Sequence, residues 1–86
     1  MEPYEIIKHP LSTEKSIRML EAENKLVFSV HLKAKKKDVK EALEKMFNVK
    51  ILNVNTFITP GGEKRAYVKL APEFPAIDIA TDLGLM

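Results

Sequence analysis

The feature that most constrains the fold is a change of hydrophobic period near the middle of the chain. In residues 26–33 one set of apolar side chains recurs at every second position, which predicts a strand with one buried face. That face would hold Leu26, Phe28, Val30 and Leu32. In residues 37–47 the apolar side chains recur at i, i+3, i+4, i+7 and i+8, which predicts a helix with one buried stripe. The stripe would hold Val39, Ala42, Leu43, Met46 and Phe47.

The residues before this segment predict a short strand and a short helix. Residues 4–8 favour an extended piece that Pro10 ends. Ser12 is a suitable N-cap, and Asn24 is a stop signal, so a helix is expected over residues 13–22. Its apolar stripe would consist of Ile17 and Leu20.

The residues after the central helix predict a hairpin. Residues 50–59 favour a strand, but the adjacent apolar residues Ile51 and Leu52 break the alternation, which indicates a β-bulge. Residues 59–63 are typical of a turn, and a second strand follows and ends before Pro72.

The C-terminal residues 76–83 predict a short helix that packs through Ile77, Ala80 or Leu83. The element order is then β-α-β-α-β-β-α. This order predicts an α+β fold, with a mainly antiparallel sheet and helices packed on it. At 86 residues the chain has room for a single domain, residues 1–86, with a thin core.

Composition excludes several classes of protein. The chain has no cysteine, so neither a disulfide framework nor a thiolate metal site is expected. No apolar run approaches the roughly 20 residues of a membrane span, and the first residues lack the pattern of a signal peptide. We therefore expect a cytoplasmic protein without direct membrane insertion.

Positive charge is concentrated in two places, although the net charge is only +2. The clusters are Lys33, Lys35, Lys36, Lys37 and Lys40, and then Lys64, Arg65 and Lys69. Segregated charge of this kind is typical of a surface that faces phosphates, and a solvated helix face remains the alternative for the first cluster.

The sequence does not predict an enzyme, a metal site or a cofactor. His9 and His31 are the only histidines and lie on separate predicted elements, so they do not form a zinc site by themselves. Ser12 and Thr13 fit helix capping better than nucleophilic catalysis. Gly61 and Gly62 fit a tight turn, because no GKS/T motif or helix follows them.

The remaining polar residues are better suited to RNA. Asn53, Asn55 and Thr56 lie in a predicted strand, where asparagine is disfavoured unless a bulge or an edge tolerates it. Amide and hydroxyl groups on an exposed sheet face can bond to phosphates, 2′-hydroxyls and base edges. Tyr67, between Arg65 and Lys69, would add an aromatic face for stacking.

Two of these segments also carry a family resemblance. The stretch from His9 to Lys15, which reads HPLSTEK, and Val54-Asn55-Thr56 resemble motifs of the ribosomal protein L23 family, as do the intervening basic helix start and the end of that helix. The resemblance runs over about residues 4–83. It implies a structural protein that binds large-subunit rRNA at the rim of the polypeptide exit tunnel, beside ribosomal protein L29, and helps to dock nascent-chain factors.

The resemblance and the basic clusters together define the predicted sites. The rRNA-binding residues are Lys8, His9, Pro10, Lys15, Lys35, Lys37, Asn53, Asn55, Thr56, Lys64, Arg65 and Lys69. The factor-docking residues are Ser12, Thr13 and Glu14. Glu14 is either an exposed anion for a basic factor or a partner of the helix dipole, and the two roles are compatible.

The resemblance departs from bacterial members at one point. Bacterial members carry a long basic loop between the last two strands, whereas only residues 59–64 join them here. This short turn and the C-terminal residues 79–84 look archaeal, which favours the signal recognition particle or the translocon as the docking factor.

Two other functions are considered. A small α+β regulatory or protein-interaction module without RNA binding would explain the modest net charge. An acylphosphatase-like hydrolase would need an arginine in a phosphate-binding loop, and Arg18 and Arg65 are poorly placed for it.

Overall fold

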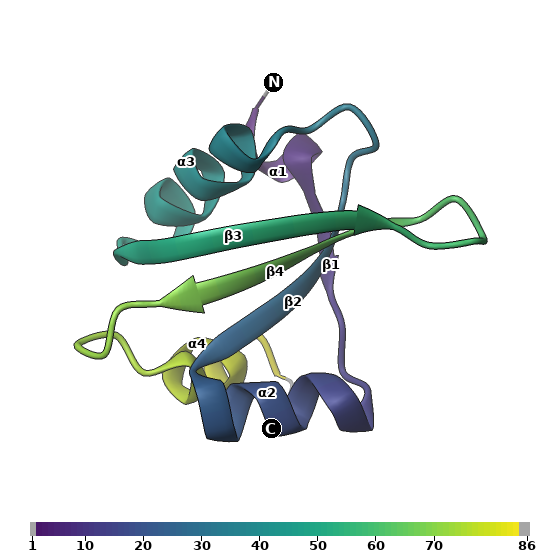
Figure 1. Cartoon of the computed structure of the whole chain (residues 1–86). Coiled ribbons are helices and arrows are strands. Elements are labelled where there is room, and N and C mark those ends of the chain that lie inside the picture. The colour runs from purple at the N-terminus through teal and green to yellow at the C-terminus, as the bar shows by residue number, and fades with distance from the viewer. Residues whose placement is uncertain (1, 85–86) are drawn as a thin grey trace.

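The structure is a computed structural model that describes residues 2–84 as one layered α+β domain (Figure 1). Its elements are α1 (Pro3–Ile6), β1 (Ile7–Pro10), α2 (Glu14–Glu23), β2 (Lys25–Val30), α3 (Lys36–Phe47), β3 (Ile51–Ile58), β4 (Lys64–Leu70) and α4 (Ala76–Asp82). The predicted fold class is therefore confirmed, and a four-residue helix precedes the first strand. No helix within residues 2–84 is long and apolar enough to cross a membrane.

The four strands form one antiparallel sheet in the order β1-β2-β4-β3. The edges are therefore the short strand β1 and the longer strand β3. The pairing of β3 with β4 shifts register between Ile51 and Asn53, which confirms the predicted bulge. Beyond the bulge the hairpin is regular up to the pair of Ile58 with Lys64.

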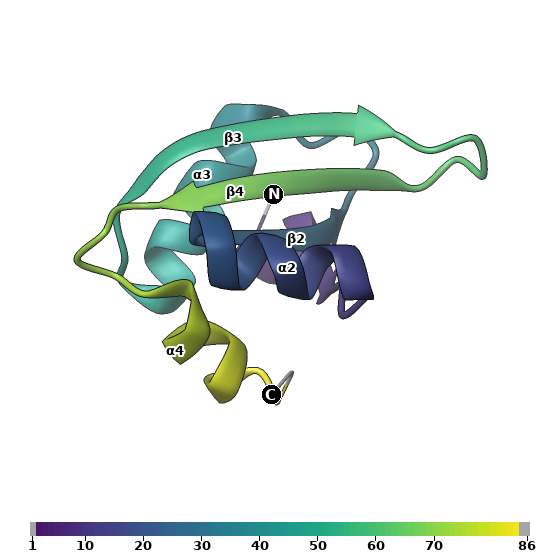
Figure 2. The same ribbon diagram turned by 60° about the horizontal axis from the view of Figure 1, so that its bottom comes forward.

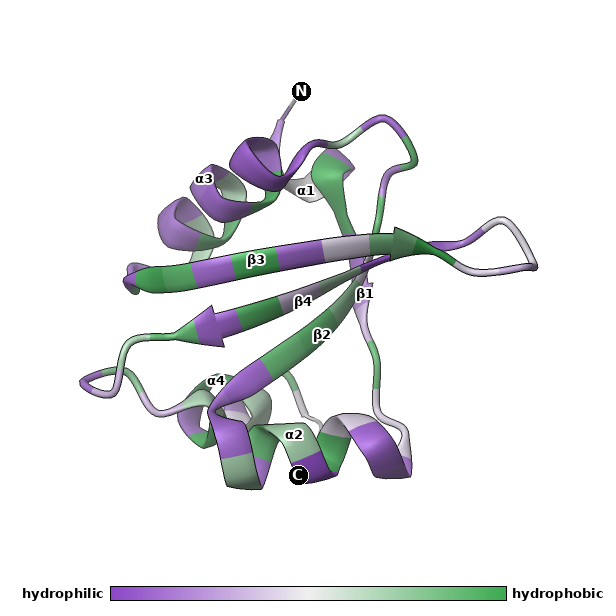
Figure 3. Ribbon diagram, in the orientation of Figure 1, coloured by the Kyte–Doolittle hydropathy of each residue, from purple (hydrophilic) through white to green (hydrophobic). Residues whose placement is uncertain are grey.

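Helices lie on both sides of this sheet. Figure 2 shows α2 in front of β2, whereas α3 lies behind β4. Val39 and Leu43 of α3 are buried with Phe28 and Val68 in one apolar cluster. Met19 of α2 instead lines a small pocket on the other side of the sheet. Figure 3 shows polar and apolar segments alternating along β3, whereas β2 is apolar along most of its length.

Strand β2 departs from the predicted pattern of one buried face. Val27 and Ser29 were expected to face solvent, but both are buried. Val27 lies under α2, and Ser29 lies between His9 of β1 and Arg65 of β4. Leu32 was expected in the core but is 51% exposed. The strand ends at Val30, so the alternation no longer fixes the direction of Leu32.

Several boundaries differ from the sequence prediction. Residues 4–6 are helical rather than extended, and the strand begins only at Ile7. The N-cap of α2 is Thr13 rather than Ser12: the Thr13 hydroxyl accepts a hydrogen bond from the Ser16 N–H at 3.2 Å. The Ser16 hydroxyl in turn accepts from the Thr13 N–H at 2.8 Å. This reciprocal capping box takes the capping function away from Ser12.

The central helix and α4 bury somewhat different residues from those expected. In α3, Val39, Ala42 and Leu43 are buried, but Met46 is 45% exposed. In α4 the buried residues are Ala76, Ile79 and Ala80, whereas Ile77 is exposed and Leu83 packs only partly against the core.

One asparagine ties α4 to the rest of the domain. Asn24 ends α2, as predicted, and it does so in the left-handed conformation with φ of 56°. Its side-chain oxygen accepts from the Ala76 N–H at 2.6 Å. Its amide nitrogen lies within 3.2–3.3 Å of three carbonyl oxygens, those of Leu70, Ala71 and Phe74. The residue therefore joins the end of α2, the end of β4 and the start of α4.

Candidate nucleic-acid interface

The outer side of the β3–β4 hairpin forms an uncovered sheet surface, which we call the open face. The register pairs Asn53 with Lys69, Asn55 with Tyr67 and Phe57 with Arg65. Because side chains alternate across a strand, these six residues point to the same side, away from the buried pair Val54 and Val68. Helix α2 covers β2 on this side but leaves most of the hairpin accessible (Figure 2).

Two aromatic rings lie in contact on the open face. The rings of Phe57 and Tyr67 are stacked, with centroids 5.2 Å apart and planes inclined by 8°. Tyr67 was predicted as an isolated aromatic residue, whereas Phe57 was not identified. The sequence gives one indication of Phe57, its position two residues after Asn55. That spacing places Phe57 on the open face only once the hairpin register is known.

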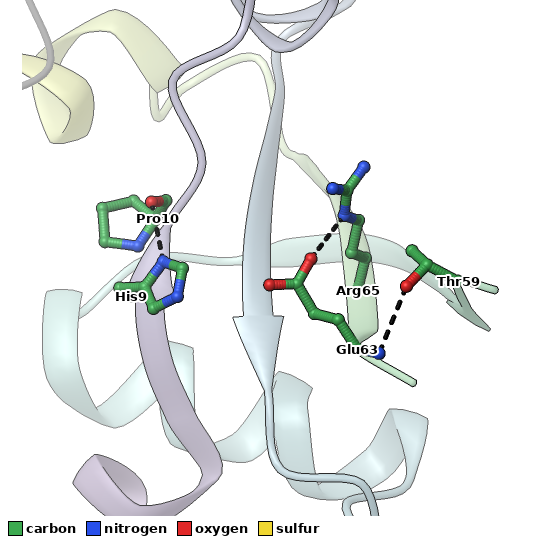
Figure 4. A network of polar contacts seen from close by, with 5 residues as sticks. All are labelled: His9, Pro10, Thr59, Glu63 and Arg65. Atoms are coloured by element: carbon green, nitrogen blue, oxygen red, sulfur yellow. Dashed lines mark hydrogen bonds and ion pairs between the residues drawn. The ribbon is translucent and has the colours of Figure 1, made fainter. Parts of the chain in front are cut away.

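Charge on the open face is arranged around Arg65. The Arg65 guanidinium donates a hydrogen bond to the Glu63 carboxylate at 2.7 Å (Figure 4). That hydrogen bond holds the pKa of Glu63 below its ordinary value and raises the pKa of Arg65. Glu63 is itself held by the turn, because its N–H donates to the Thr59 hydroxyl at 3.2 Å. The turn thus fixes the direction of a permanently charged guanidinium.

Lys15 of α2 lies beside the open face. It lines a small pocket together with Arg65 and Tyr67, over a floor that includes Val27 and Met19. Residues 50 positions apart in the chain thereby form one positively charged rim. The sequence had placed Lys15 and Arg65 in separate segments, and tertiary structure brings them together.

A second basic surface lies along the free edge of β3. Here a groove of about 280 Å³ runs between α3 and β3, and we call it the basic groove. Its lining residues are Lys36, Lys37, Lys40, Leu52, Asn53 and Val54. Asn53 therefore belongs both to this groove and to the open face, which makes the two surfaces adjacent.

The first turn of α3 carries part of the predicted basic cluster, but its N-terminus already has an anionic partner. The Asp38 carboxylate accepts a hydrogen bond from the Lys35 N–H at 3.1 Å, so an anion of the chain itself already interacts with the helix dipole. Lys35 is exposed but does not line the basic groove, whereas Lys36 and Lys40 do. The lysine side chains, rather than the helix N-terminus, are what this region can offer to a phosphate.

Of the other predicted rRNA-binding residues, only His9 shares a side of the sheet with the open face, because it pairs with Ser29, which in turn pairs with Arg65. Lys8, His9 and Pro10 lie on β1, the opposite edge of the sheet. His9 approaches the Pro10 carbonyl through Nδ1 at 3.3 Å (Figure 4). Thr56 faces the opposite side of β3 from the open face. The Lys64 ammonium donates to the Ala34 carbonyl at 2.6 Å, which holds the loop before α3.

The predicted factor-docking residues lie at the start of α2. Ser12, Thr13 and Glu14 are exposed. The Thr13 hydroxyl is engaged in the capping box, and Glu14 pairs with Arg18 at 2.7 Å on the helix surface. Ser12 and Glu14 are thus the accessible polar groups of this segment.

Within residues 2–84 no group of three or more histidine or acidic side chains could hold a metal ion. The polar groups brought together are lysine, arginine and amide side chains next to stacked aromatic rings. This combination is typical of surfaces that contact nucleic acid.

Comparison with known proteins agrees with this assignment. The model of a family described as ribosomal protein L23 matches residues 5–76. The large ribosomal subunit protein uL23 of Methanococcus vannielii is 46% identical over 85 residues, which cover 99% of this chain and 99% of that relative.

Proposed function

The chain belongs to the ribosomal protein L23 family, and we propose that it binds large-subunit rRNA through the open face and the basic groove together. Membership makes it a non-enzymatic structural component of the large ribosomal subunit, of the archaeal type. Which residues meet the rRNA is the subject of the proposal.

The observation that carries this proposal is the continuity of the two surfaces at Asn53. The basic groove offers three lysines, and the open face offers Arg65 and Lys69. The two amides are not used by the fold: within residues 2–84 the side chains of Asn53 and Asn55 make no hydrogen bond, whereas Arg65 is paired with Glu63. Lysines position an RNA through its phosphates, while amides bond to 2′-hydroxyls and base edges.

The proposal is tested by measuring binding across a salt series. The purified chain is mixed with a transcript of Methanococcus vannielii large-subunit rRNA or with an unrelated structured RNA of equal length. We expect tighter binding to the rRNA, and a log–log salt slope of about −0.7 to −0.9 for each phosphate neutralised. Equal affinity for both RNAs, or a flat salt dependence, would contradict the proposal and favour a protein-interaction module.

The position within the subunit is a second part of the proposal. We place the chain at the rim of the polypeptide exit tunnel, beside ribosomal protein L29, with the start of α2 facing outward to the signal recognition particle or the translocon. The short β3–β4 turn favours a position at the rim over one inside the tunnel. It spans only residues 59–63 and is closed by a hydrogen bond of 2.8 Å from the Thr59 N–H to the Glu63 carbonyl.

Charge reversal tests the docking surface separately from rRNA binding. Glu14→Lys should weaken cosedimentation of the signal recognition particle with subunits that contain the variant, because an exposed anion becomes a cation. Arg18→Ala is the matched control, since it removes the partner of Glu14 but keeps the carboxylate. Unchanged cosedimentation with Glu14→Lys would remove Glu14 from the docking surface.

A further inference from the structure

The stacked rings of the open face lie at the free edge of the sheet formed by β3. Phe57 is on β3, which is an edge strand, and Tyr67 is on the inner strand β4. Tyr67 also borders the pocket formed with Met19 and Val27 under α2. On the far side of the pair, Phe57 keeps 45% of its surface exposed. The stack is therefore closed at Tyr67 and open at Phe57.

An exposed phenylalanine at this position needs an explanation. The core is complete without it, because Phe57 lies on the side of β3 opposite to the buried Val54. An aromatic pair of this geometry adds only about 0.5–1.5 kcal/mol beyond burial, and a half-exposed ring keeps a large apolar area in water. A ligand with a flat π-face would cover that area and continue the stack.

The groups around Phe57 select the chemistry of such a ligand. Arg65 is the direct cross-strand neighbour of Phe57 and carries a fixed positive charge. Asn55 lies two residues before Phe57 on the same face, is exposed, and directly faces Tyr67 across the hairpin. A π-face, an amide and a guanidinium side by side match the base, the base edge and the phosphate of one nucleotide.

We propose that Phe57 receives one unpaired nucleobase of the rRNA, stacked on the ring side turned away from Tyr67. The Asn55 amide then bonds to the edge of that base, and Arg65 bonds to a neighbouring phosphate. The inference rests on the proposed function and refines it: the ligand of this part of the surface is an extruded nucleotide rather than a duplex. Bases within a duplex stack on one another and offer no free face to a protein ring.

The test compares ring removal with ring retention in the full chain bound to the Methanococcus vannielii rRNA transcript. Phe57→Leu removes the ring but keeps an apolar side chain, and Phe57→Tyr keeps the ring. Ile58→Ala is the control, because Ile58 is 59% exposed on the opposite side of the same strand. Affinity is measured together with two footprints, one with hydroxyl radicals for the backbone and one with reagents that modify the base edges.

We expect Phe57→Leu to weaken binding by about 5- to 150-fold, since stacking of one base contributes on the order of 1–3 kcal/mol. Phe57→Tyr and Ile58→Ala should bind within about twofold of the parent. At least one unpaired base should be protected by the parent and by Phe57→Tyr, but become reactive with Phe57→Leu, while the backbone footprint persists.

Three results would overturn the inference. In the first, Phe57→Leu binds like the parent and leaves base reactivity unchanged, so that the open face contacts the backbone only or a protein. In the second, Ile58→Ala weakens binding as much as Phe57→Leu, so that the effect belongs to the hairpin and not to the ring. In the third, the parent leaves no footprint on the rRNA, which would overturn the proposed function as well.

Discussion

The two sides of the β3–β4 hairpin have the same backbone and opposite roles. Toward the core, Val54, Ala66 and Val68 are 6%, 0% and 0% exposed and pack beneath α3. On the open face, Phe57 is 45% exposed, and Asn55 and Lys69 are exposed as well. The comparison shows that the period of two lets one hairpin stabilise the domain with one set of residues and recognise a ligand with the other.

The largest expected effect is a difference in the free energy of unfolding between a core residue, Phe28, and an open-face residue, Phe57. Phe28→Ala, in the strand next to the hairpin, should lower the free energy of unfolding by about 3–5 kcal/mol, because a side chain 1% exposed leaves a cavity. Phe57→Ala should lower it by less than about 1.5 kcal/mol, since it loses mainly the contact with Tyr67. Urea unfolding measures both. If Phe28→Ala does not fold, Phe28→Leu takes its place. Similar losses of unfolding free energy at positions 28 and 57 would contradict the distinction between core and open face.

The next effect concerns two asparagines in the left-handed conformation, one with a hydrogen-bonded side chain and one with an exposed side chain. Asn24→Gly keeps the backbone conformation but removes the hydrogen bonds to the α4 segment, so we expect a loss of about 1–3 kcal/mol in the free energy of unfolding. Asn48→Gly is the control, because Asn48 has φ of 54° but an exposed side chain. It should change stability by a few tenths of a kcal/mol at most. Hydrogen exchange should show faster opening of α4 in Asn24→Gly alone.

A smaller effect sharpens the description of the basic groove. The predicted rRNA-binding residues include Lys35 and Lys37 but not Lys40 or Lys45, whereas the structure places Lys37 and Lys40 in the groove and leaves Lys35 and Lys45 outside it. The double variant of Lys37→Ala and Lys40→Ala should reduce the magnitude of the rRNA salt slope by about 1.4–1.8. The Lys35→Ala and Lys45→Ala pair should leave the slope nearly unchanged. Equal reductions by both pairs would show that the groove has no special role.

The smallest effect concerns the ion pair at the rim of the open face. The Arg65 hydrogen bond lowers the pKa of Glu63 in the folded state, so this pair stabilises the fold above the ordinary carboxylate pKa and ceases to do so as pH falls through the lowered value. Arg65→Gln should return the Glu63 pKa toward its ordinary value, as measured by NMR titration of the side-chain carboxyl. Both side chains are 35% exposed, so solvent screens the ion pair and the change in stability should be close to the detection limit. A Glu63 pKa unchanged by the substitution would show that another group lowers it.

Strand β2 shows why local pattern predicts elements better than burial. Alternation correctly identified a strand, but it could not show that Val27 and Ser29 are buried on the second side, Val27 beneath α2. Similarly, the sequence around Ser12 and Thr13 contained two good N-caps. The choice of Thr13 depends on Ser16, whose hydroxyl completes the capping box and donates to the Leu11 carbonyl at 3.0 Å.

The candidate site also contains residues that the sequence identified and residues that only the structure identified. Lysine clusters and asparagines in a strand are visible in the sequence because their residue types are unusual for those positions. Phe57 was missed because an aromatic residue in a strand is ordinary, and only the hairpin register shows that it stacks on Tyr67. Lys64 illustrates the converse, since a lysine predicted to bind rRNA has its ammonium engaged with the Ala34 carbonyl.

The sequence by itself determined every element except α1, together with the bulge, the hairpin and the family, because period, turn residues and motifs act over short distances along the chain. Tertiary structure alone decided which side of each strand is covered, that Lys15 lies beside Arg65, and that Asn24 joins α2 to α4. These relations connect residues about 50 positions apart, and they depend on how the helices pack on the two sides of the sheet. Local physical chemistry does not fix that packing. The alternation of a strand separates its residues into two faces, but it does not show whether a helix covers one face or both.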